Sequence, residues 1–300
     1  MKRLLSAVLL VAAGGGAAHA QELDARAYAP APIGTTIVIA GVGGSKGAVL
    51  FDPSAGLDDV EADLSVVTTG IGYTFGIAGR QARILAVMPS AFGRFDGTVH
   101  GETQRQDVGG LVDPRIKLSY AWRGGPALTA AEFARAPRRT VIGTSVTVMV
   151  PLGSYESTRA VNLGYHRWGV KPEVGISRTI GAWTLDGYAG VWLYTTNRRY
   201  LPGSARKAQD PLGSLQGHVS YALPRRMWIA LDATWFGGGQ TTVEGRVSPD
   251  EQRNTRVGAT FSLPLTRAQS LKLTYSSGTS TRRGTDFDNL MLTWQLVKLR

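Results

Sequence analysis

The ten residues from Trp168 to Ser177 alternate between two kinds of side chain, and this alternation limits the folds open to the chain. One parity is apolar and the other is small or charged: Trp168, Val170, Pro172, Val174 and Ile176 against Gly169, Lys171, Glu173, Gly175 and Ser177. Because successive side chains of a strand point to opposite faces, a strand here has one apolar face and one face with opposite charges. In a soluble sheet, the apolar face would pack on a core.

The same alternation recurs along most of the chain, and few wholly apolar strands remain to supply a second layer of core. A closed barrel in lipid needs this pattern, with apolar side chains outside and polar side chains inside. No segment approaches twenty consecutive apolar residues, so the sequence predicts no transmembrane helix. The predicted fold class is all-β: a transmembrane antiparallel β-barrel of about 12 strands, with short periplasmic turns and longer extracellular loops.

The first twenty residues have the features of an export signal. Lys2 and Arg3 precede the apolar run from Leu4 to Ala13, and small residues lead to Ala18-His19-Ala20. This pattern predicts a signal peptide over 1–20 and one outer-membrane β-barrel domain over 21–300. A membrane anchor is the alternative, but the apolar run is too short to span a bilayer. Export and alternation together indicate the outer membrane of a Gram-negative bacterium.

The chain has 300 residues, no cysteine and a formal charge of +11, which becomes +9 (11 minus 2) when Lys2 and Arg3 leave with the signal peptide. The basic residues are scattered singly, so we expect no nucleic-acid partner. The expected partners are outer-membrane lipid and lipopolysaccharide, the barrel-assembly machinery and a small-molecule solute, and no cofactor is expected. Surface solubility is an equally good explanation of the charge.

Twelve strands are predicted at roughly 33–45, 62–75, 80–97, 110–123, 139–152, 166–179, 182–197, 213–223, 226–239, 252–263, 268–280 and 286–298. Short connections alternate with longer polar ones, which include 46–61 and 100–109. An even count of strands brings both termini to the periplasm. One periplasmic connection, 124–139, is longer: Thr129 and Glu132 have capping-box spacing and predict a short helix, with a plain long turn as the alternative.

Aromatic residues gather near the predicted strand ends, as a membrane-interface girdle requires. The periplasmic group is Tyr73, Phe75, Tyr120, Trp122, Trp183, Tyr221 and Trp294, and the outer group is Trp168, Tyr194, Trp235 and Tyr275.

Parity also predicts which side chains line the lumen, because a charge facing lipid at mid-depth costs several kcal/mol. The predicted lumen-lining residues are Asp113, Arg115, Lys117, Arg167, Lys171, Glu173, Asp186, Tyr188, Trp192, Gln216, His218, Asp232, Arg256 and Lys272. They favour a pore lined by opposed charges, in which Tyr188 and Trp192 offer a stacking surface to a solute. A salt-bridged network that fills a narrow lumen is the alternative.

Signals for catalysis or metal binding are weak. His218 is the one histidine predicted inside a strand, and its neighbours form no nucleophile motif. Asp52, Asp58, Asp59 and Glu61 carry oxygen ligands that suit calcium, but an exposed acidic loop is the favoured interpretation. We therefore predict no enzyme activity, no catalytic residue and no metal site.

Several short motifs spread over the mature chain look familiar together. They are Arg26 to Gly34, Leu50 to Ser54, Asp113-Pro114-Arg115, Val150 to Gly153, Lys171 to Gly175, Ala189 to Trp192, Gln209 to Leu212 and Gln216 to Tyr221. The chain resembles the outer-membrane family called "putative MetA-pathway of phenol degradation". This resemblance implies a transporter-like outer-membrane barrel and carries no established functional residues. The ending Val297-Lys298-Leu299-Arg300 departs from the terminal aromatic common in such barrels. Trp294 is the candidate to replace it, and an extended terminus is the alternative.

The sequence thus predicts an outer-membrane channel or transporter for passive uptake of small solutes, with aromatic or anionic solutes as candidates. The main alternative is a non-transporting structural or adhesive barrel whose lumen is closed by ion pairs. A membrane hydrolase built around His218 ranks third.

Overall fold

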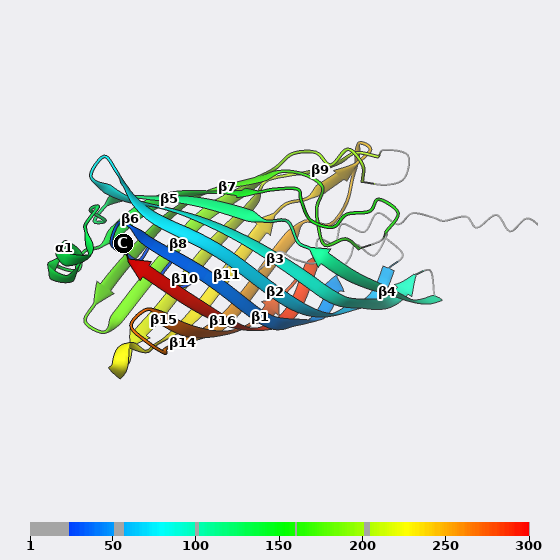
Figure 1. Cartoon of the computed structure of the whole chain (residues 1–300). Helices are drawn as coiled ribbons and strands as arrows, with labels where there is room; N and C mark the ends of the chain where they lie inside the picture. The colour runs from blue at the N-terminus through cyan, green and yellow to red at the C-terminus, as the bar shows by residue number, and fades with distance from the viewer. Residues whose placement is uncertain (1–23, 51–56, 100–101, 160, 201–204, 300) are drawn as a thin grey trace, which may run out of the picture.

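A computed structural model describes residues 24–50, 57–99, 102–159, 161–200 and 205–299, so the predicted signal peptide lies outside the described residues. The chain forms one antiparallel β-barrel of tilted strands (Figure 1). Its strands are β1 (Thr35–Leu50), β2 (Leu57–Ile77), β3 (Arg80–Val99), β4 (Glu102–Leu111), β5 (Arg115–Arg123), β6 (Val141–Met149), β7 (Gly169–Ile180), β8 (Trp183–Tyr194), β10 (Leu212–Ala222), β11 (Trp228–Gly238), β14 (Gln252–Pro264), β15 (Gln269–Ser280) and β16 (Gly284–Leu299).

The barrel closes between its first and last strands, which pair from Thr35↔Leu299 to Leu50↔Gly284. The sheet has 13 strands, but β4 and β5 both pair with β3 and share one place in the barrel, which leaves twelve (13 minus 1). The predicted all-β barrel and its strand number are confirmed. Closure gives each of these twelve places a paired neighbour on both sides, which is what a sheet in lipid requires.

The barrel has its apolar side chains outside and its polar side chains inside. On β7, Val174 and Ile176 are about half exposed on the outer surface, whereas Lys171 and Glu173 are buried. A slip of one residue would put both charges into lipid, at a cost of ~2–4 kcal/mol for a lysine at mid-depth. The inward and outward faces predicted for this strand are therefore set by the lipid that surrounds the barrel.

Short turns and a short α-helix gather at one end, together with the C-terminal end of β16 (Figure 1). The predicted helix is confirmed as α1 (Ala130–Arg135), where Thr129 accepts from the Glu132 amide and the Glu132 carboxylate accepts from the Thr129 amide. A short 3-10 turn, η2 (Pro224–Arg226), connects β10 to β11. No helix in the described part of the chain is long and apolar enough to cross a membrane.

The opposite end is built from longer connections, and two of the predicted loops there are wrong. Residues 46–50 and 57–61 extend β1 and β2, and residues 102–109 form β4. A strand needs only about 9–11 residues to cross a bilayer, so β2 and β3, with 21 and 20 residues, project beyond it. Apolar side chains explain the extension, because Val49, Phe95 and Val108 pack with Val161 and Leu163 of the 150–168 connection.

A smaller sheet completes this outer end. It has three strands and joins β9 (Lys207–Gln209), β12 (Thr241–Val243) and β13 (Arg246–Val247).

The acidic loop predicted before the second strand is wrong. Asp58, Asp59 and Glu61 belong to β2, while Asp52 lies outside the described residues.

Most of the predicted aromatic girdle lies on the outer surface. Exposed rings at the short-turn end include Tyr73, Trp122, Trp183 and Tyr221, and those at the outer end are Trp168, Trp235 and Tyr275. Tyr194 is a correction: it packs against the interior cluster of Met149, Trp192 and Leu212, because it has the parity of Trp192 on β8.

The fourth predicted strand is broken at residues 112–114. Pro114 has no amide hydrogen to donate to a ladder, and Asp113 turns its carboxylate to the 150–168 connection. Its Oδ1 accepts from the Gly153 amide at 2.8 Å and its Oδ2 accepts from the Tyr165 amide at 2.7 Å. The break therefore anchors the connection between β6 and β7 to the barrel wall.

Candidate functional site

The predicted lumen residues are all buried or half-buried in the structure. Eleven are buried, namely Asp113, Arg167, Lys171, Glu173, Asp186, Tyr188, Trp192, Gln216, His218, Asp232 and Arg256. Arg115 and Lys117 are half-buried, and so is Lys272, which contacts Asp24. Their service in a solute path remains a prediction.

Residues 24–33, which precede β1, lie within the lumen, and the strand pattern does not predict this. Residues 25–28 form a turn, with the Ala27 amide donating to Asp24 at 3.2 Å and the Ala29 amide donating to Arg26 at 2.9 Å. We call residues 24–33 the N-terminal plug. Its side chains and backbone bond to β3, β6, β7, β8 and β10, so it occupies the space that these strands enclose.

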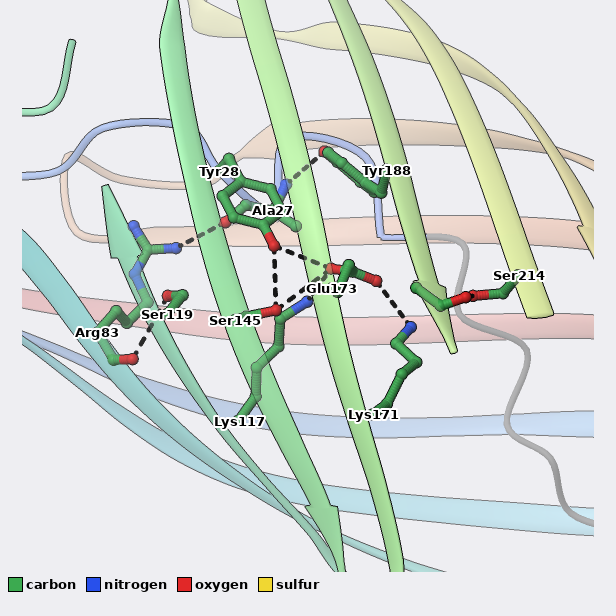
Figure 2. A network of polar contacts seen from close by, with 11 residues as sticks. Ala27, Tyr28, Arg83, Lys117, Ser119, Ser145, Lys171, Glu173, Tyr188 and Ser214 are labelled. Carbon is green, nitrogen blue, oxygen red and sulfur yellow. Dashed lines mark hydrogen bonds and ion pairs between the residues drawn. The ribbon is translucent and has the colours of Figure 1, made fainter. Parts of the chain in front are cut away.

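Tyr28 is the most deeply held residue of the plug. Its ring lies 5.1 Å from the ring of Tyr188, and the ammonium of Lys117 lies 5.5 Å from its centre. Its hydroxyl lies 3.0 Å from Ser145 Oγ and 3.1 Å from Glu173 Oε1. Figure 2 shows these groups converging on the hydroxyl from neighbouring strands. Both the polar and the apolar part of the side chain are therefore bound.

Two glycines make room for this ring. Gly143 of β6 and Gly175 of β7 are paired across the ladder. A Cβ at Gly175 would lie 2.2 Å from Tyr28 Cε2, and a Cβ at Gly143 would lie 2.9 Å from Tyr28 Cδ1. Real carbon atoms do not approach that closely, so the wall accepts the ring because it lacks side chains there.

Glu173 is the charged centre of the same network. Lys171 Nζ lies 2.7 Å from Oε2, and Lys117 Nζ lies 2.9 Å from Oε1 (Figure 2). Alternation places Lys171 and Glu173 on one face of β7, while Lys117 reaches across from β5. Two ammonium groups around one carboxylate leave a local excess of positive charge inside the barrel.

Arg26 anchors the other side of the plug. Its backbone has φ 66°, a conformation that costs a non-glycine residue energy unless its surroundings hold it. Its amide donates to Asp186 Oδ2 at 3.3 Å, and its Nε donates to Ser220 Oγ at 2.9 Å. The guanidinium also lies 4.5 Å from the centre of the Trp228 ring. These contacts hold the turn in place.

The plug leaves the lumen through Pro30 and Pro32. Each proline disfavours a helical conformation in the residue before it. Arg83 Nη2 donates to the Ala29 carbonyl at 3.1 Å, and the Ala31 amide donates to Gln81 Oε1 at 2.8 Å. The Ile33 amide donates to Leu128 in the connection that carries α1, at 2.8 Å. The plug is thus joined to the short-turn end of the barrel.

His218 lies beside the plug and pairs with Asp232, with Nδ1 2.7 Å from Oδ1. Thr260 Oγ1 donates to Asp232 Oδ2 at 3.0 Å. The nearest serine on the same face of β10, Ser220, accepts from Arg26 and donates weakly to Thr184 at 3.5 Å, so it is engaged by the plug. This arrangement orients His218 through Asp232 and engages Ser220 in the plug.

The outer half of the lumen combines cations with aromatic rings. Trp192 and Tyr194 stack with 6.0 Å between ring centres. Arg115 lies 5.5 Å and Lys171 5.8 Å from the centre of the Trp192 ring, and Arg167 lies 4.4 Å from that of Tyr194. Guanidinium and ammonium groups are attracted to aromatic faces. Together they make a positively charged, ring-rich region in the outer half of the barrel interior.

Lys207, in the outer three-stranded sheet, extends this positive region. Its Nζ lies 4.4 Å from the centre of the Tyr200 ring and donates to the Tyr200 hydroxyl at 3.4 Å. Burial, together with the nearby Arg167, lowers the pKa of Lys207 to about 7, and Asp250 opposes the shift. The charge at this rim therefore changes near neutral pH.

The plug has a weak sequence signal that strand reasoning passed over. Arg26, Tyr28 and the proline pair fall in the first of the short motifs, Arg26 to Gly34, ahead of the first predicted strand at 33–45. A charged residue and a tyrosine ahead of two prolines do not fit a strand and need partners elsewhere. Their partners lie far along the chain, so sequence periodicity could not have identified them.

The COG4313 outer membrane channel from Pseudomonas putida F1 is similar in structure, with a TM-score of 0.77 and 20% identity over 92% of this chain and 100% of that chain. The β-domain of the Bordetella autotransporter BrkA has a TM-score of 0.50 and 13% identity, over 88% and 99%. The transport unit of the autotransporter AIDA-I from Escherichia coli has a TM-score of 0.50 and 10% identity, over 89% and 90%.

These identities are low, so the likenesses establish the fold of an outer-membrane β-barrel. No curated protein matches the sequence significantly. The sequence pattern of one family matches residues 44–294, which include every strand of the barrel in whole or in part. The chain therefore belongs to the family described as "Putative MetA-pathway of phenol degradation".

Proposed function

We propose that this protein is an outer-membrane channel for passive uptake of small solutes, with aromatic and anionic solutes as the candidates. The proposal rests on one observation: a separate segment, residues 24–33, occupies the lumen through side-chain and backbone hydrogen bonds and joins none of its strand ladders. A segment held in this way can leave while the barrel stays closed. Its departure would vacate a path lined by charges and rings.

The chemistry of the lumen supports the choice of solutes. Arg115, Lys171 and Arg167 lie over aromatic rings in the outer half, which suits anions and flat aromatic molecules. The structure of the Pseudomonas putida F1 protein is that of an outer membrane channel, and the family is described by a pathway of phenol degradation. Both descriptions agree with the proposal.

Planar-bilayer recordings would test it. The full chain and a variant lacking residues 24–32 should both insert, and the variant should carry a severalfold larger current because its lumen is vacated. An Arg105→Gln variant is a matched control, since Arg105 lies on the exposed face of β4 and pairs with Asp107. Absence of current from both the full chain and the deletion variant would contradict the channel function.

A non-transporting barrel is the second candidate, and the closed lumen favours it. Polar side chains and the plug fill the short-turn half of the interior, and Lys117, Lys171 and Glu173 form an ion-paired centre. In that case, deletion of residues 24–32 would lower stability without producing current. The same recordings therefore separate the two candidates.

A further inference from the structure

We propose that the slot occupied by Tyr28 is a binding site for phenols, and that a para-substituted phenol binds there in place of Tyr28. The inference rests on the proposed function for its biological meaning, since it names a solute class for the same lumen. The side chain of tyrosine is itself a para-alkylphenol. The plug thus places a phenol group against the wall of the barrel. The contacts of that group show which chemical features the wall can bind.

The slot binds the ring through shape. Gly143 and Gly175 lack Cβ atoms on neighbouring strands. The ring of Tyr28 lies against the positions that these atoms would occupy. Tyr188 covers the ring from one side, at 5.1 Å between centres and an angle of 51°. Such tilted ring pairs are favourable for any benzene ring. A flat six-membered aromatic ring therefore fits, whereas a bulky aliphatic group would clash with the strands on either side.

The slot binds the hydroxyl through charge. Glu173 Oε1 and Ser145 Oγ lie within 3.1 Å of the Tyr28 oxygen and can accept a hydrogen bond from its hydroxyl. The carboxylate is held in position by Lys117 at 2.9 Å and Lys171 at 2.7 Å. A hydrogen bond to an ionised acceptor is among the stronger ones in proteins. An aromatic hydrocarbon without a hydroxyl would forgo this hydrogen bond, and Oε1 would keep only Lys117 and Ser145 as donors.

Displacement of Tyr28 is a competition between two phenols. A tethered ligand acts at an effective concentration on the order of millimolar, so a free phenol competes with wild-type protein only at comparable or higher concentration. Removal of the Tyr28 ring abolishes this competition. The site should therefore show its intrinsic affinity in a Tyr28→Ala variant.

Binding can be measured in detergent solution by ¹⁹F NMR, with p-fluorophenol as the probe and p-fluorotoluene as the matched compound without a hydroxyl. Tyr28→Ala protein should bind p-fluorophenol about 10–100-fold more tightly than p-fluorotoluene, the factor that a hydrogen bond to a charged group provides. Unlabelled p-cresol should displace the probe. Equal binding of the two probes, or no binding, would overturn the proposal.

Two further variants fix the location. Gly175→Val in the Tyr28→Ala background refills the slot from the wall and should abolish binding of p-fluorophenol, whereas Gly217→Val, on the outer face of β10, should leave binding unchanged. Binding that survives Gly175→Val would place the probe elsewhere and overturn the proposal. Should the double variants fail to fold, the comparison of the two probes on Tyr28→Ala still decides.

Wild-type protein gives an independent measurement that needs no substitution. Titration of p-cresol should displace Tyr28 and raise the bilayer current, whereas toluene at the same concentration should leave it unchanged. The NMR assay requires no conduction, so phenol binding without current would reject the channel and keep the site. Current without phenol binding would reject the site and keep the channel.

Discussion

Gly143 of β6 and Gly175 of β7 face each other across the ladder, and the ring of Tyr28 lies against both. The pair makes a local hollow in the inner face of the wall. A hollow matched to a ring that comes from outside the barrel strands indicates that the wall and the plug are fitted to one another. The plug is therefore a specific part of the structure, and its fit can be weakened one atom at a time.

A single methyl group at Gly175 should loosen the plug. The Cβ of Gly175→Ala would lie 2.2 Å from Tyr28 Cε2, so the ring must move out of the slot and away from Glu173. We expect the bilayer current of this variant to rise severalfold above wild type, toward that of the variant lacking residues 24–32. Gly217→Ala adds a methyl group where no atom lies within 4 Å and serves as the control. An unchanged current in Gly175→Ala would show that the position of Tyr28 does not limit flow.

Parity predicts the barrel well, because lipid enforces it at every membrane-spanning strand. Lys171, Glu173 and Asp186 could be assigned to the interior from alternation alone, since their placement in lipid would cost several kcal/mol. Outside the bilayer this penalty vanishes, and there the predictions fail. Residues 102–109 appear as a polar loop in the sequence yet pair as β4, where Val108 packs into an apolar cluster at the outer end.

The plug and the strand break escaped sequence reasoning for a different reason. Tyr28 depends on Ser145 and Glu173, more than a hundred residues away. Asp113 has the parity of a lumen residue, but its carboxylate accepts from the Gly153 and Tyr165 amides. Both features depend on hydrogen bonds between distant residues, and such bonds leave no periodic pattern in one sequence.

Replacement of Glu173 by glutamine should destabilise the barrel. The carboxylate is 1% exposed and bridges Lys171 and Lys117, so its loss leaves two ammonium groups facing each other inside the lumen. Removal of one partner from a buried ion pair costs about 3–5 kcal/mol. We expect Glu173→Gln to unfold at a lower urea concentration, measured by the electrophoretic shift of the folded barrel.

Two variants control for this effect. Glu156→Gln removes a carboxylate that is 56% exposed in its pair with Arg159, and should change stability by less than about 1 kcal/mol. Lys171→Met combined with Glu173→Gln removes one of the two ammonium groups and should recover part of the lost stability. Equal stability of wild type and Glu173→Gln would contradict a structural role for the ion-paired centre.

Asp113→Ala should release the connection between β6 and β7. The Gly153 and Tyr165 amides would lose their acceptor, at about 1–3 kcal/mol for each donor left buried and unpaired. We expect trypsin, added to intact proteoliposomes, to cleave the protein faster at Arg159, within this connection, while the strands stay protected. Asp63→Ala is a suitable control, since Asp63 is 54% exposed in its pair with Lys46. Unchanged cleavage would show that other contacts hold the connection.

The charge of Lys207 should make the selectivity of the channel depend on pH. Burial, together with the nearby Arg167, lowers the pKa of Lys207 from its ordinary 10.5 to about 7, and Asp250 opposes the shift. The pKa is lower in the folded protein, so stability falls as pH decreases from about 10.5 to about 7. The ammonium is present below this value and lost above it, and a cation at the rim attracts anions.

Anion selectivity should therefore decrease as pH rises from 6 to 8, measured as reversal potential in a salt gradient with the variant lacking residues 24–32. Lys207→Met in the same background should show the lower selectivity at both pH values, because it lacks the titrating charge. Arg246→Met, in β13 of the same outer sheet and exposed, should keep the pH step of the parent. A step that persists in Lys207→Met would assign the titration to another group at the rim.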